Sequence, residues 1–388
     1  MLKKLKKEKL KILTFVLLLA FYVANAISDW LLLRWWTISD GIEFQDLNAV
    51  LINVDCYENI GWGVYGAQRE DPCQNYVYGS TLIRVLHFLG LGSSNKIILG
   101  WLAVVVISYI LADVTSSMAK HSHSSYITAL LISISPPVLL LIERGNFDWL
   151  VFALVYFGAS FYARGYRKLG FFVLVFSSLV KFYTFPLTLL CVFLMKNRKE
   201  QLFSLLIIGI TFTIIVRDIT QLRTIYIDGW FAAFGNVTWA KYLILVGIDL
   251  HPFAAALLGL LVTGILVLVI RKTYLNPIIL KLRIDNLSTL DYFAMFSIFT
   301  FLSCFLAGQN FDYRLVFLIP GLWFLSKTAI RAGLSLILFL VAFFFSYNVL
   351  SLQPIGDLAI NLIVAVVLLA LPVLLNQFNA ANLRVKSD

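Results

Sequence analysis

The chain has 388 residues, of which 60% are hydrophobic and 13% are charged, and its formal net charge is +10. Soluble globular domains carry about 25% charged residues, so this composition excludes that class and predicts a protein embedded in a membrane. Runs such as residues 252–270 supply the roughly 20 apolar positions that an α-helix needs to cross a bilayer. We therefore expect an all-α polytopic membrane protein, in which residues 1–388 form a single integral membrane domain.

The N-terminal segment is basic and then apolar, as in a secretory signal peptide. Residues 1–11 contain six lysines, and the hydrophobic run that follows passes through an AxA-like sequence. The run continues as far as Leu33, which favours an uncleaved signal anchor over a cleaved signal. Residues 1–11 are then a cytosolic N-terminus, and the first span covers 12–33.

About twelve spans are expected, because that many apolar segments approach the length of a transmembrane helix. Residues 169–180 and 184–195 are short, and we interpret them as two half-length helices joined at a break that lines a cavity. Residues 81–93 contain Arg84 and His87, so we expect an interfacial helix there. The predicted spans are 12–33, 97–114, 126–142, 146–162, 169–180, 184–195, 202–216, 250–270, 289–306, 312–326, 332–349 and 358–376.

The distribution of charge indicates which ends of the spans face the cytosol. With the N-terminus inside, the inside segments carry 21 of the 31 Lys and Arg residues. This bias follows the positive-inside rule, so the net positive charge requires no nucleic-acid partner, and membrane lipids are the expected surroundings. Carboxylates show the opposite bias, with 15 of 21 outside. We therefore expect acid–base chemistry at the external face.

The long polar segment from Trp35 to Ser80 separates the first span from the rest of the chain. It combines many carboxylates with Gly, Tyr and Trp, whereas disordered linkers lack aromatic residues. We interpret residues 36–96 as a folded external catalytic loop together with the interfacial helix. Cys56 and Cys73 both lie in this loop on the oxidising side, and we expect a disulfide between them rather than two free thiols.

Two outer turns between spans are unusually polar. The first, ERGNFD, contains Glu143, Arg144, Asn146 and Asp148. The second, GQNFDYR, contains Gln309, Asn310, Asp312, Tyr313 and Arg314. Ionisable residues at membrane depth are functional candidates. The alternative for the first turn is a structural Arg–carboxylate pair.

Lys181 is the most costly residue to place in the membrane, because it lies in a long stretch without other charges. A lysine at the bilayer centre costs about 2.5–3.5 kcal/mol on insertion scales. Pro186 breaks the helix nearby and lets the ammonium reach a wet cavity, where a phosphate is the favoured partner. The alternative is a structural lysine that snorkels to the surface.

A second external segment, residues 217–249, mixes basic residues with tyrosine and tryptophan. This mixture suits a sugar or lipid-headgroup surface and also any interfacial helix. We expect the two polar turns and Lys181 to converge beneath the first external loop. The sequence contains no metal-binding or nucleotide-binding motif, so we expect neither a metal nor another cofactor.

The segments FQDLN, ERGNFDW, LVKFYTFPL and GQNFDYRLVFLIP, in this order, resemble the multispan bacterial glycosyltransferases of the GT-C superfamily. The resemblance is greatest to glycosyltransferase family 87, the mannosyltransferase-like family, and covers roughly residues 40–320. It implies a GT-C-type helical bundle in the bacterial inner (plasma) membrane, with the active site facing the periplasm. It also implies an enzyme that takes a sugar from a polyprenyl-phosphate carrier, uses a carboxylate in the first outer loop and usually needs no metal.

The resemblance assigns roles to particular residues. The family's early aspartate matches Asp46, with Asp40 and Glu43 as alternatives, and its lysine before a broken helix matches Lys181. Its GN-D element matches Gly145, Asn146 and Asp148. The family often has Lys-Xaa-Xaa-Pro, whereas here Pro186 comes five residues after Lys181.

Transfer from a lipid phosphate requires a base that deprotonates the acceptor hydroxyl and cations that stabilise the departing phosphate. Asp46 is the expected base, and without a second carboxylate nucleophile the reaction inverts the anomeric centre. The expected phosphate cradle consists of Lys181, Arg144 and Arg314. The expected substrate contacts are Asn146, Asp148, Tyr183, Tyr78, Gln309, Asn310, Asp312 and Tyr313.

The sequence therefore predicts a metal-independent, inverting hexosyltransferase that moves a monosaccharide from a polyprenyl-phosphate donor to a lipid-linked or cell-envelope glycan acceptor. Two other classes stay open. A lipid-linked glycan flippase or transporter would use the same basic cavity but would not need the carboxylate-rich loop. An O-antigen-polymerase-like enzyme would transfer a whole oligosaccharide and rely on arginines in two large outer loops. Sparse arginines and concentrated carboxylates favour monosaccharide transfer.

Overall fold

A computed structural model describes residues 2–36, 43–60, 79–120, 122–195, 197–221, 233–234, 252–274, 287–306, 310–327, 332–345 and 353–384. Most of these residues are helical. The first half of the chain contains α1 (Leu2–Ile27), α2 (Leu31–Trp36), α3 (Gln45–Ile60), α4 (Ser80–Phe88), α5 (Lys96–Met118), α6 (His123–Ser133), α7 (Pro136–Arg144), α8 (Asp148–Ala163), α9 (Arg167–Val180) and α10 (Phe185–Leu194). The second half contains α11 (Arg198–Gln221), α13 (Pro252–Tyr274), α14 (Thr289–Leu306), α15 (Leu322–Lys327), α16 (Ala332–Phe345) and α17 (Gln353–Arg384).

Several helices are long and apolar enough to cross a membrane, which confirms the prediction of an α-helical membrane protein. Within the described residues, five meet this condition: Glu8–Ile27, Ser93–Met118, Arg198–Thr220, Thr289–Leu306 and Gln353–Pro372. The bent pair of α6 and α7 is a sixth if it counts as one span. Other predicted spans coincide with shorter helices. Because a single crossing needs roughly 20 residues, the count of twelve spans stays a prediction.

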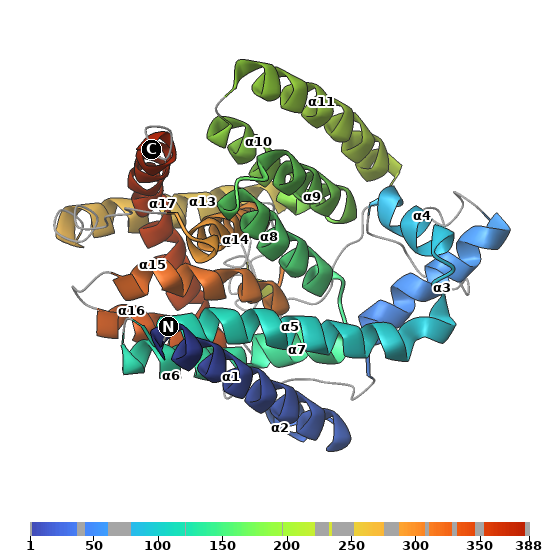
Figure 1. Cartoon of the computed structure of the whole chain (residues 1–388), viewed down its shortest axis with the longest axis horizontal. Helices are drawn as coiled ribbons and strands as arrows, with labels where there is room; N and C mark the ends of the chain where they lie inside the picture. The colour runs from blue at the N-terminus through green and yellow to red at the C-terminus, as the bar shows by residue number, and fades with distance from the viewer. Residues whose placement is uncertain are drawn as a thin grey trace.

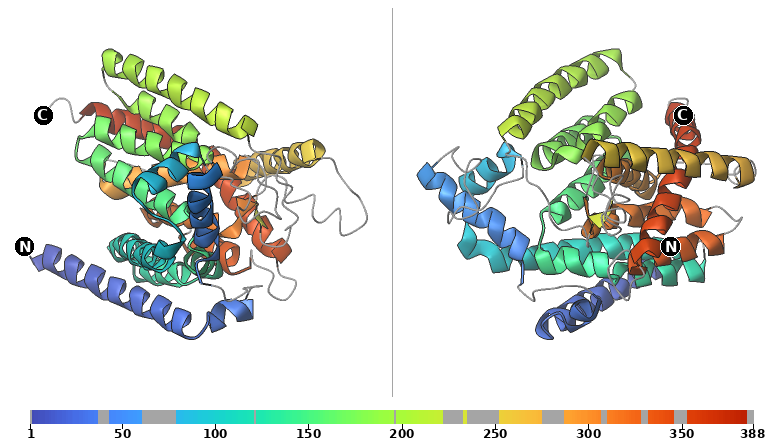
Figure 2. Two further views of the ribbon diagram at one scale, coloured as in Figure 1. Left: turned by 90° about the vertical axis from the view of Figure 1, so that its right-hand side faces the viewer. Right: turned by 180° about the vertical axis from the view of Figure 1, so that it is seen from behind.

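Helices α3 and α4 form one end of the molecule (Figure 1), and this end faces the viewer in the left panel of Figure 2. From there the longer helices run toward the opposite end, where α15, α16 and part of α17 lie. Helix α1 packs along α5, α8 packs against both α9 and α14, and α17 contacts α13 and α16. Aromatic rings fill the contact between α8 and α14, where Phe293 lies 5.3 Å from Phe152 and 5.1 Å from Tyr156 between ring centroids.

The segment predicted to be an external loop after the first span contains a helix, α3. Its apolar side chains follow the i, i+3, i+4, i+7 spacing of an amphipathic helix. These residues are Leu47, Val50, Leu51 and Val54, and none is more than 3% exposed. The predicted interfacial helix at 81–93 is shorter than expected, because α4 ends at Phe88. A short 3₁₀ turn (Ser93–Asn95) then leads into α5.

The predicted break between two half-length helices is present. Helix α9 ends at Val180, and Lys181 has an extended backbone with φ −138° and ψ 117°. The 3₁₀ turn η3 (Phe182–Thr184) follows, and α10 then begins with Pro186 in its first turn. Proline is tolerated there because the first N–H groups of a helix have no partner within it. The break places Lys181 at the joint between two short helices.

A long 3₁₀ helix, η6 (Asp312–Gly321), leads from the second polar turn into the bundle. It directly follows β2 (Asn310–Phe311), which pairs in antiparallel fashion with β1 (Ala233–Phe234). The segment predicted to be the second external one, residues 217–249, therefore contacts the chain just before Arg314. Runs of 3₁₀ helix longer than three or four residues are uncommon, and η6 has 10 residues.

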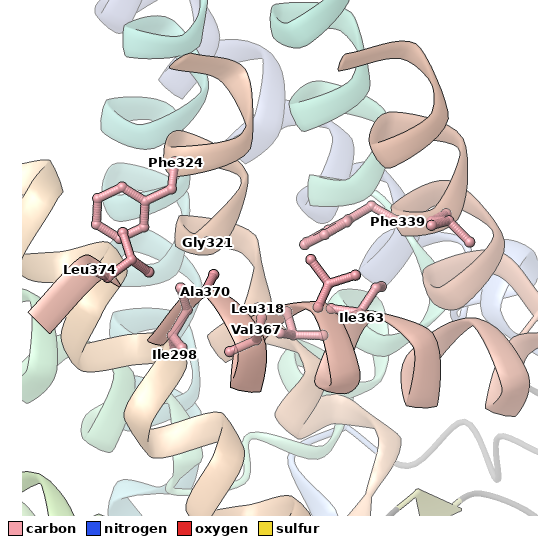
Figure 3. A pocket seen from close by; sticks show the side chains of 11 residues that line it. Ile298, Leu318, Gly321, Phe324, Phe339, Ile363, Val367, Ala370 and Leu374 are labelled. Atoms are coloured by element: carbon pink, nitrogen blue, oxygen red, sulfur yellow. The ribbon is translucent and has the colours of Figure 1, made fainter. Parts of the chain in front are cut away.

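An apolar cavity lies beside η6, between α14, α15, α16 and α17 (Figure 3). Its empty volume is about 620 Å³, part of which is open to the surroundings. Figure 3 shows Val367 and Leu374 of α17 on its wall together with Ile298 of α14, Leu318 of η6 and Phe339 of α16. Leu318 lies four positions after Arg314 on the same 3₁₀ helix. The cavity and the polar turn thus share one structural element.

Candidate functional site

The start of α3 is anchored by Phe44, which sets the position of the following residues. The Phe44 N–H donates to the backbone carbonyl of Glu143 at 2.6 Å, and its ring is fully buried. Phe44 has a left-handed backbone with φ 56°, which is uncommon for a bulky residue. Gly100 of α5 makes room for the ring, because a Cβ there would lie 2.3 Å from ring atoms. The first turn of α3 is therefore held against α5 and the end of α7.

Asp46 lies in the first turn of α3 and contacts the polar turn between α7 and α8. Its Oδ2 accepts a hydrogen bond from Asn146 Nδ2 at 2.8 Å, and its Oδ1 lies 3.6 Å from Arg144 Nη1. The same guanidinium donates to Gln45 Oε1 at 2.7 Å. A carboxylate is favoured in this turn by the helix dipole. The Asp46 side chain is 27% exposed, so part of the carboxylate stays accessible.

The turn that carries Asn146 depends on a glycine. Gly145 ends α7 in the left-handed conformation, with φ 60°, where glycine is favoured because it has no Cβ. A Cβ on Gly145 would lie 3.1 Å from side-chain atoms of Phe44 and Leu47. Asn146 Oδ1 accepts the Asp148 N–H at 3.1 Å. The amide of Asn146 is thereby oriented, with its oxygen toward α8 and its nitrogen toward Asp46.

Lys181 reaches the same turn from the break between α9 and α10. Its Nζ lies 3.1 Å from Asn146 Oδ1 and 3.3 Å from Asp148 Oδ1. The Lys181 side chain is 8% exposed and that of Asp148 is 0% exposed. A buried charge without a partner is very unfavourable, so these two acceptors account for a lysine at this position. In this arrangement the ammonium ends in a buried polar cluster rather than at the surface.

The Asp148 carboxylate gathers two further groups. Its Oδ2 lies 3.1 Å from Arg314 Nε, and its Oδ1 accepts a hydrogen bond from the Tyr183 hydroxyl. The Arg314 guanidinium lies 5.0 Å from the centroid of the Tyr183 ring, within the range of a cation–π contact. One fully buried carboxylate therefore holds Lys181, Arg314 and Tyr183 together. The position of both cations depends on Asp148.

These contacts form a continuous cluster, which we call the outer cluster after its predicted position at the external face. It joins α3, the α7–α8 turn, the α9–α10 break and η6, so the expected convergence of polar groups is present. Side-chain exposure falls from 27% at Asp46 through 16% at Arg314 and 8% at Lys181 to 0% at Asp148. Among the described residues the cluster balances three carboxylates against three cations: Asp46, Glu143 and Asp148 against Arg144, Lys181 and Arg314. Within the described residues the network is mostly buried, and Asp46 is its most exposed carboxylate.

Several predicted site residues lie outside the described part of the chain. These are Asp40, Tyr78 and Gln309. Asn310, Asp312 and Tyr313 are described by their backbone alone, in β2 and at the start of η6. Glu43 lies in the turn before α3. The roles assigned to all of these residues stay predictions.

The predicted disulfide is described on one side only. Cys56 of α3 is disulfide-bonded, whereas Cys191 and Cys304 are buried thiols. Cys73 lies outside the described residues. The pairing of Cys56 with Cys73 therefore stays a prediction.

Two contributors to the outer cluster were not predicted from the sequence. Gln45 accepts from Arg144, and its only signal is that it directly precedes Asp46. Phe44 fixes α3 through its backbone and through the space left by Gly100, and no local pattern reveals that pairing. Within the described residues, no group of three or more His, Cys, Asp or Glu side chains is placed to hold a metal ion.

The fold and the outer cluster define an α-helical membrane protein with a largely buried group of ion pairs. No family model, curated protein or solved structure matches the chain.

Proposed function

We propose that the protein is a membrane glycosyltransferase that moves a monosaccharide from a polyprenyl-phosphate-linked donor to a lipid-linked or cell-envelope glycan acceptor. The observation that carries the proposal is the geometry of Asp46. This carboxylate is partly exposed, and Asn146 and Arg144 hold it in the same network as the buried cations Lys181 and Arg314. A general base beside a group of cations is what transfer from a lipid phosphate requires.

In the proposed reaction Asp46 takes the proton of the acceptor hydroxyl. The acceptor oxygen attacks the anomeric carbon, and the bond from that carbon to the phosphate oxygen breaks. The polyprenyl phosphate leaves with the bonding electrons, and the anomeric configuration inverts. No metal or other cofactor takes part.

The cations Lys181, Arg144 and Arg314 receive the charge that develops on the departing phosphate. Asp148 already neutralises part of their charge, so the donor phosphate competes with Asp148 for Lys181 and Arg314. Asp148 then acts by holding the two cations in place. Asn146 and Tyr183, which contact the same groups, line the donor side of the site.

The proposal includes a GT-C-type bundle of about twelve spans in a bacterial inner membrane. Both termini are cytosolic, and the outer cluster faces the periplasm. The two-to-one bias of Lys and Arg toward the expected inside segments supports this orientation. The site is then open to donors and acceptors in the outer leaflet.

The test uses the purified full chain in lipid nanodiscs with polyprenyl-phosphate sugars and an extract of envelope lipids as acceptor. Wild-type protein should transfer sugar, and Asp46→Asn should lose about 10²–10⁴-fold or more of that rate, because an amide cannot take the acceptor proton. Asp55→Asn is the matched control, since Asp55 lies on the same helix but binds the Ser93 N–H at 3.0 Å. Wild-type transfer by Asp46→Asn would mean that Asp46 is not the base. A flippase would tolerate Asp46→Asn but would lose transport with Lys181→Met.

A further inference from the structure

The start of α4 is fastened to the helix break that carries Lys181. The Gly79 N–H donates to the backbone carbonyl of Val180 at 3.2 Å. Val180 is the last residue of α9, and Lys181 follows it directly. The last carbonyls of a helix have no partner within it, and at membrane depth an unsatisfied carbonyl is costly. Gly79 therefore stabilises the break next to the lysine.

This contact leaves no space for a side chain. A Cβ on Gly79 would lie 1.8 Å from the Leu179 carbonyl oxygen and 2.9 Å from the Leu179 carbonyl carbon. Both are backbone atoms, so no rotamer change can relieve the overlap. The Gly79 backbone itself is ordinary, with φ −62° and ψ 143°. Glycine is thus required here by close approach and not by backbone conformation.

A second contact fixes α4 from the other side. Glycine has no side chain that could cap the helix, and Asp218 of α11 caps it instead, since its Oδ2 accepts the Ser80 N–H at 2.7 Å. A carboxylate at this position also interacts favourably with the helix dipole. Arg217 Nη2 lies 3.0 Å from Ser80 Oγ and 2.8 Å from Asp218 Oδ1. Ser80 and Asp218 are each 1% exposed.

We propose that Gly79, Asp218 and Arg217, which we call the clasp, are positioning residues for Lys181. Asp218 and Arg217 hold the first turn of α4, and Gly79 transmits that position to the end of α9. The clasp thereby sets where the Lys181 backbone leaves the helix and how its ammonium meets Asn146 and Asp148. The identification of the donor phosphate as the ligand of Lys181 rests on the proposed function. The contacts of the clasp do not depend on that function.

Four variants of the full chain in nanodiscs test the clasp. Gly79→Ala pushes the break away, and Asp218→Ala removes the cap. Asp218→Asn is the conservative rescue, because an amide oxygen still accepts the Ser80 N–H. Gly209→Ala is the matched control, since Gly209 lies on α11 with no atom within 4 Å of an added Cβ.

The first measurement is hydrogen–deuterium exchange of the peptide that covers residues 177–184. Exchange should be faster in Gly79→Ala and Asp218→Ala than in wild type, and unchanged in Gly209→Ala. Asp218→Asn should restore most of the protection. Wild-type exchange in both Gly79→Ala and Asp218→Ala would overturn the clasp. If Gly79→Ala does not fold, Asp218→Ala decides on its own.

The second measurement compares binding of farnesyl phosphate with binding of farnesol, which lacks the phosphate. Wild-type protein should prefer the phosphate, and Gly79→Ala and Asp218→Ala should lose about tenfold of that preference, equivalent to about 1.4 kcal/mol. Faster exchange with an unchanged phosphate preference would overturn the positioning role. The clasp would then only stabilise the fold. A wild-type protein with no phosphate preference would reject the donor site of the proposed function, while the exchange result would still decide on the clasp.

Discussion

Within the described residues, two lysine–aspartate pairs, one partly buried and one buried, differ in their surroundings. Lys11 of α1 lies 2.9 Å from Asp113 of α5, with exposures of 15% and 13%, and the Tyr156 hydroxyl donates to the same aspartate at 2.9 Å. Lys181 lies 3.3 Å from Asp148, with exposures of 8% and 0%, and the Tyr183 hydroxyl again donates to the aspartate. The two pairs thus share a lysine, an aspartate and a tyrosine.

The difference lies in the backbone and in the number of cations. Lys11 and Asp113 connect two regular helices, α1 and α5, and Lys11 also lies 4.1 Å above the Tyr109 ring. The backbone of Lys181 lies at a helix break, and its partner Asp148 also binds Arg314. Irregular backbone in a membrane is tolerated where it lines a cavity or is buried in protein. A lysine–aspartate pair alone therefore does not indicate a site, and the proposed site rests on the helix break and on the second cation that Asp148 binds.

The largest expected effect comes from removing the aspartate of each pair. Asp148→Asn leaves Lys181 and Arg314 buried without their shared carboxylate, and loss of one partner of a buried ion pair typically costs about 3–5 kcal/mol. Its thermal midpoint should therefore fall well below that of wild type. Added pyrophosphate should restore part of the loss, because an anion that binds the folded state stabilises it.

Asp113→Asn is the matched comparison. The variant leaves only Lys11 without its carboxylate, and Lys11 is nearer the surface than Lys181. The thermal midpoint of Asp113→Asn should therefore fall less than that of Asp148→Asn, and pyrophosphate should restore none of the loss. Equal rescue of both variants by the anion would remove the distinction between the two pairs. The measurement is thermal unfolding of each purified variant with and without the anion.

Replacing the lysine of each pair separates binding from stability. Lys181→Met removes a group that should contact the donor phosphate, while Asp148 keeps Arg314 and Tyr183 as partners. Donor affinity should fall at least about tenfold, and the thermal midpoint should stay the same or rise, because a buried charge is removed. Lys11→Met should leave donor affinity unchanged. Loss of donor binding in both variants would point to a general effect on the fold.

The smallest effect on donor binding is expected from the tyrosines. Tyr183→Phe and Tyr156→Phe each remove one hydrogen bond to a carboxylate, which is worth about 1.5–3 kcal/mol of stability. Both variants should therefore unfold at lower temperature by similar amounts. Only Tyr183→Phe should also raise the KM for the donor, because the lost hydroxyl binds the Asp148 carboxylate that holds Lys181 and Arg314. Equal KM values in both variants would place Tyr183 outside the donor site.

The sequence predicted the membrane class, the break near Lys181 and the polar turn at residues 143–148, because each has a strong local signal. Hydropathy identifies apolar helices, proline marks a break, and ionisable residues stand out between two apolar segments. Helix α3 was not predicted, because its apolar repeat has only four positions and lies among many polar residues. The antiparallel pair of β1 and β2 could not be predicted either, since two residues on each strand leave no period to detect.

In the outer cluster, the sequence identified the charged residues but not their pairing. Asp148 and Lys181 stand out because each is an ionisable residue in an apolar stretch. That Asp148 holds both Lys181 and Arg314 depends on three segments meeting in space, which no local pattern encodes. The anchoring of α3 by Phe44 and Gly100 is of the same kind. Where two distant segments approach closely, the sequence shows a glycine on one of them but does not indicate which residue of the other segment it contacts.

The outer cluster also has a consequence for how the chain enters the bilayer. Asn146 and Lys181 are 35 positions apart on neighbouring segments, so a hairpin of α8 and α9 brings the lysine together with Asp148 as one nearly neutral unit. This reduces the insertion penalty of about 2.5–3.5 kcal/mol for a lone lysine. Arg314 lies 166 positions after Asp148 and is synthesised much later. In the order of synthesis, Arg314 therefore follows the α8–α9 hairpin that already pairs Lys181 with Asp148, and α15, α16 and α17 come after it.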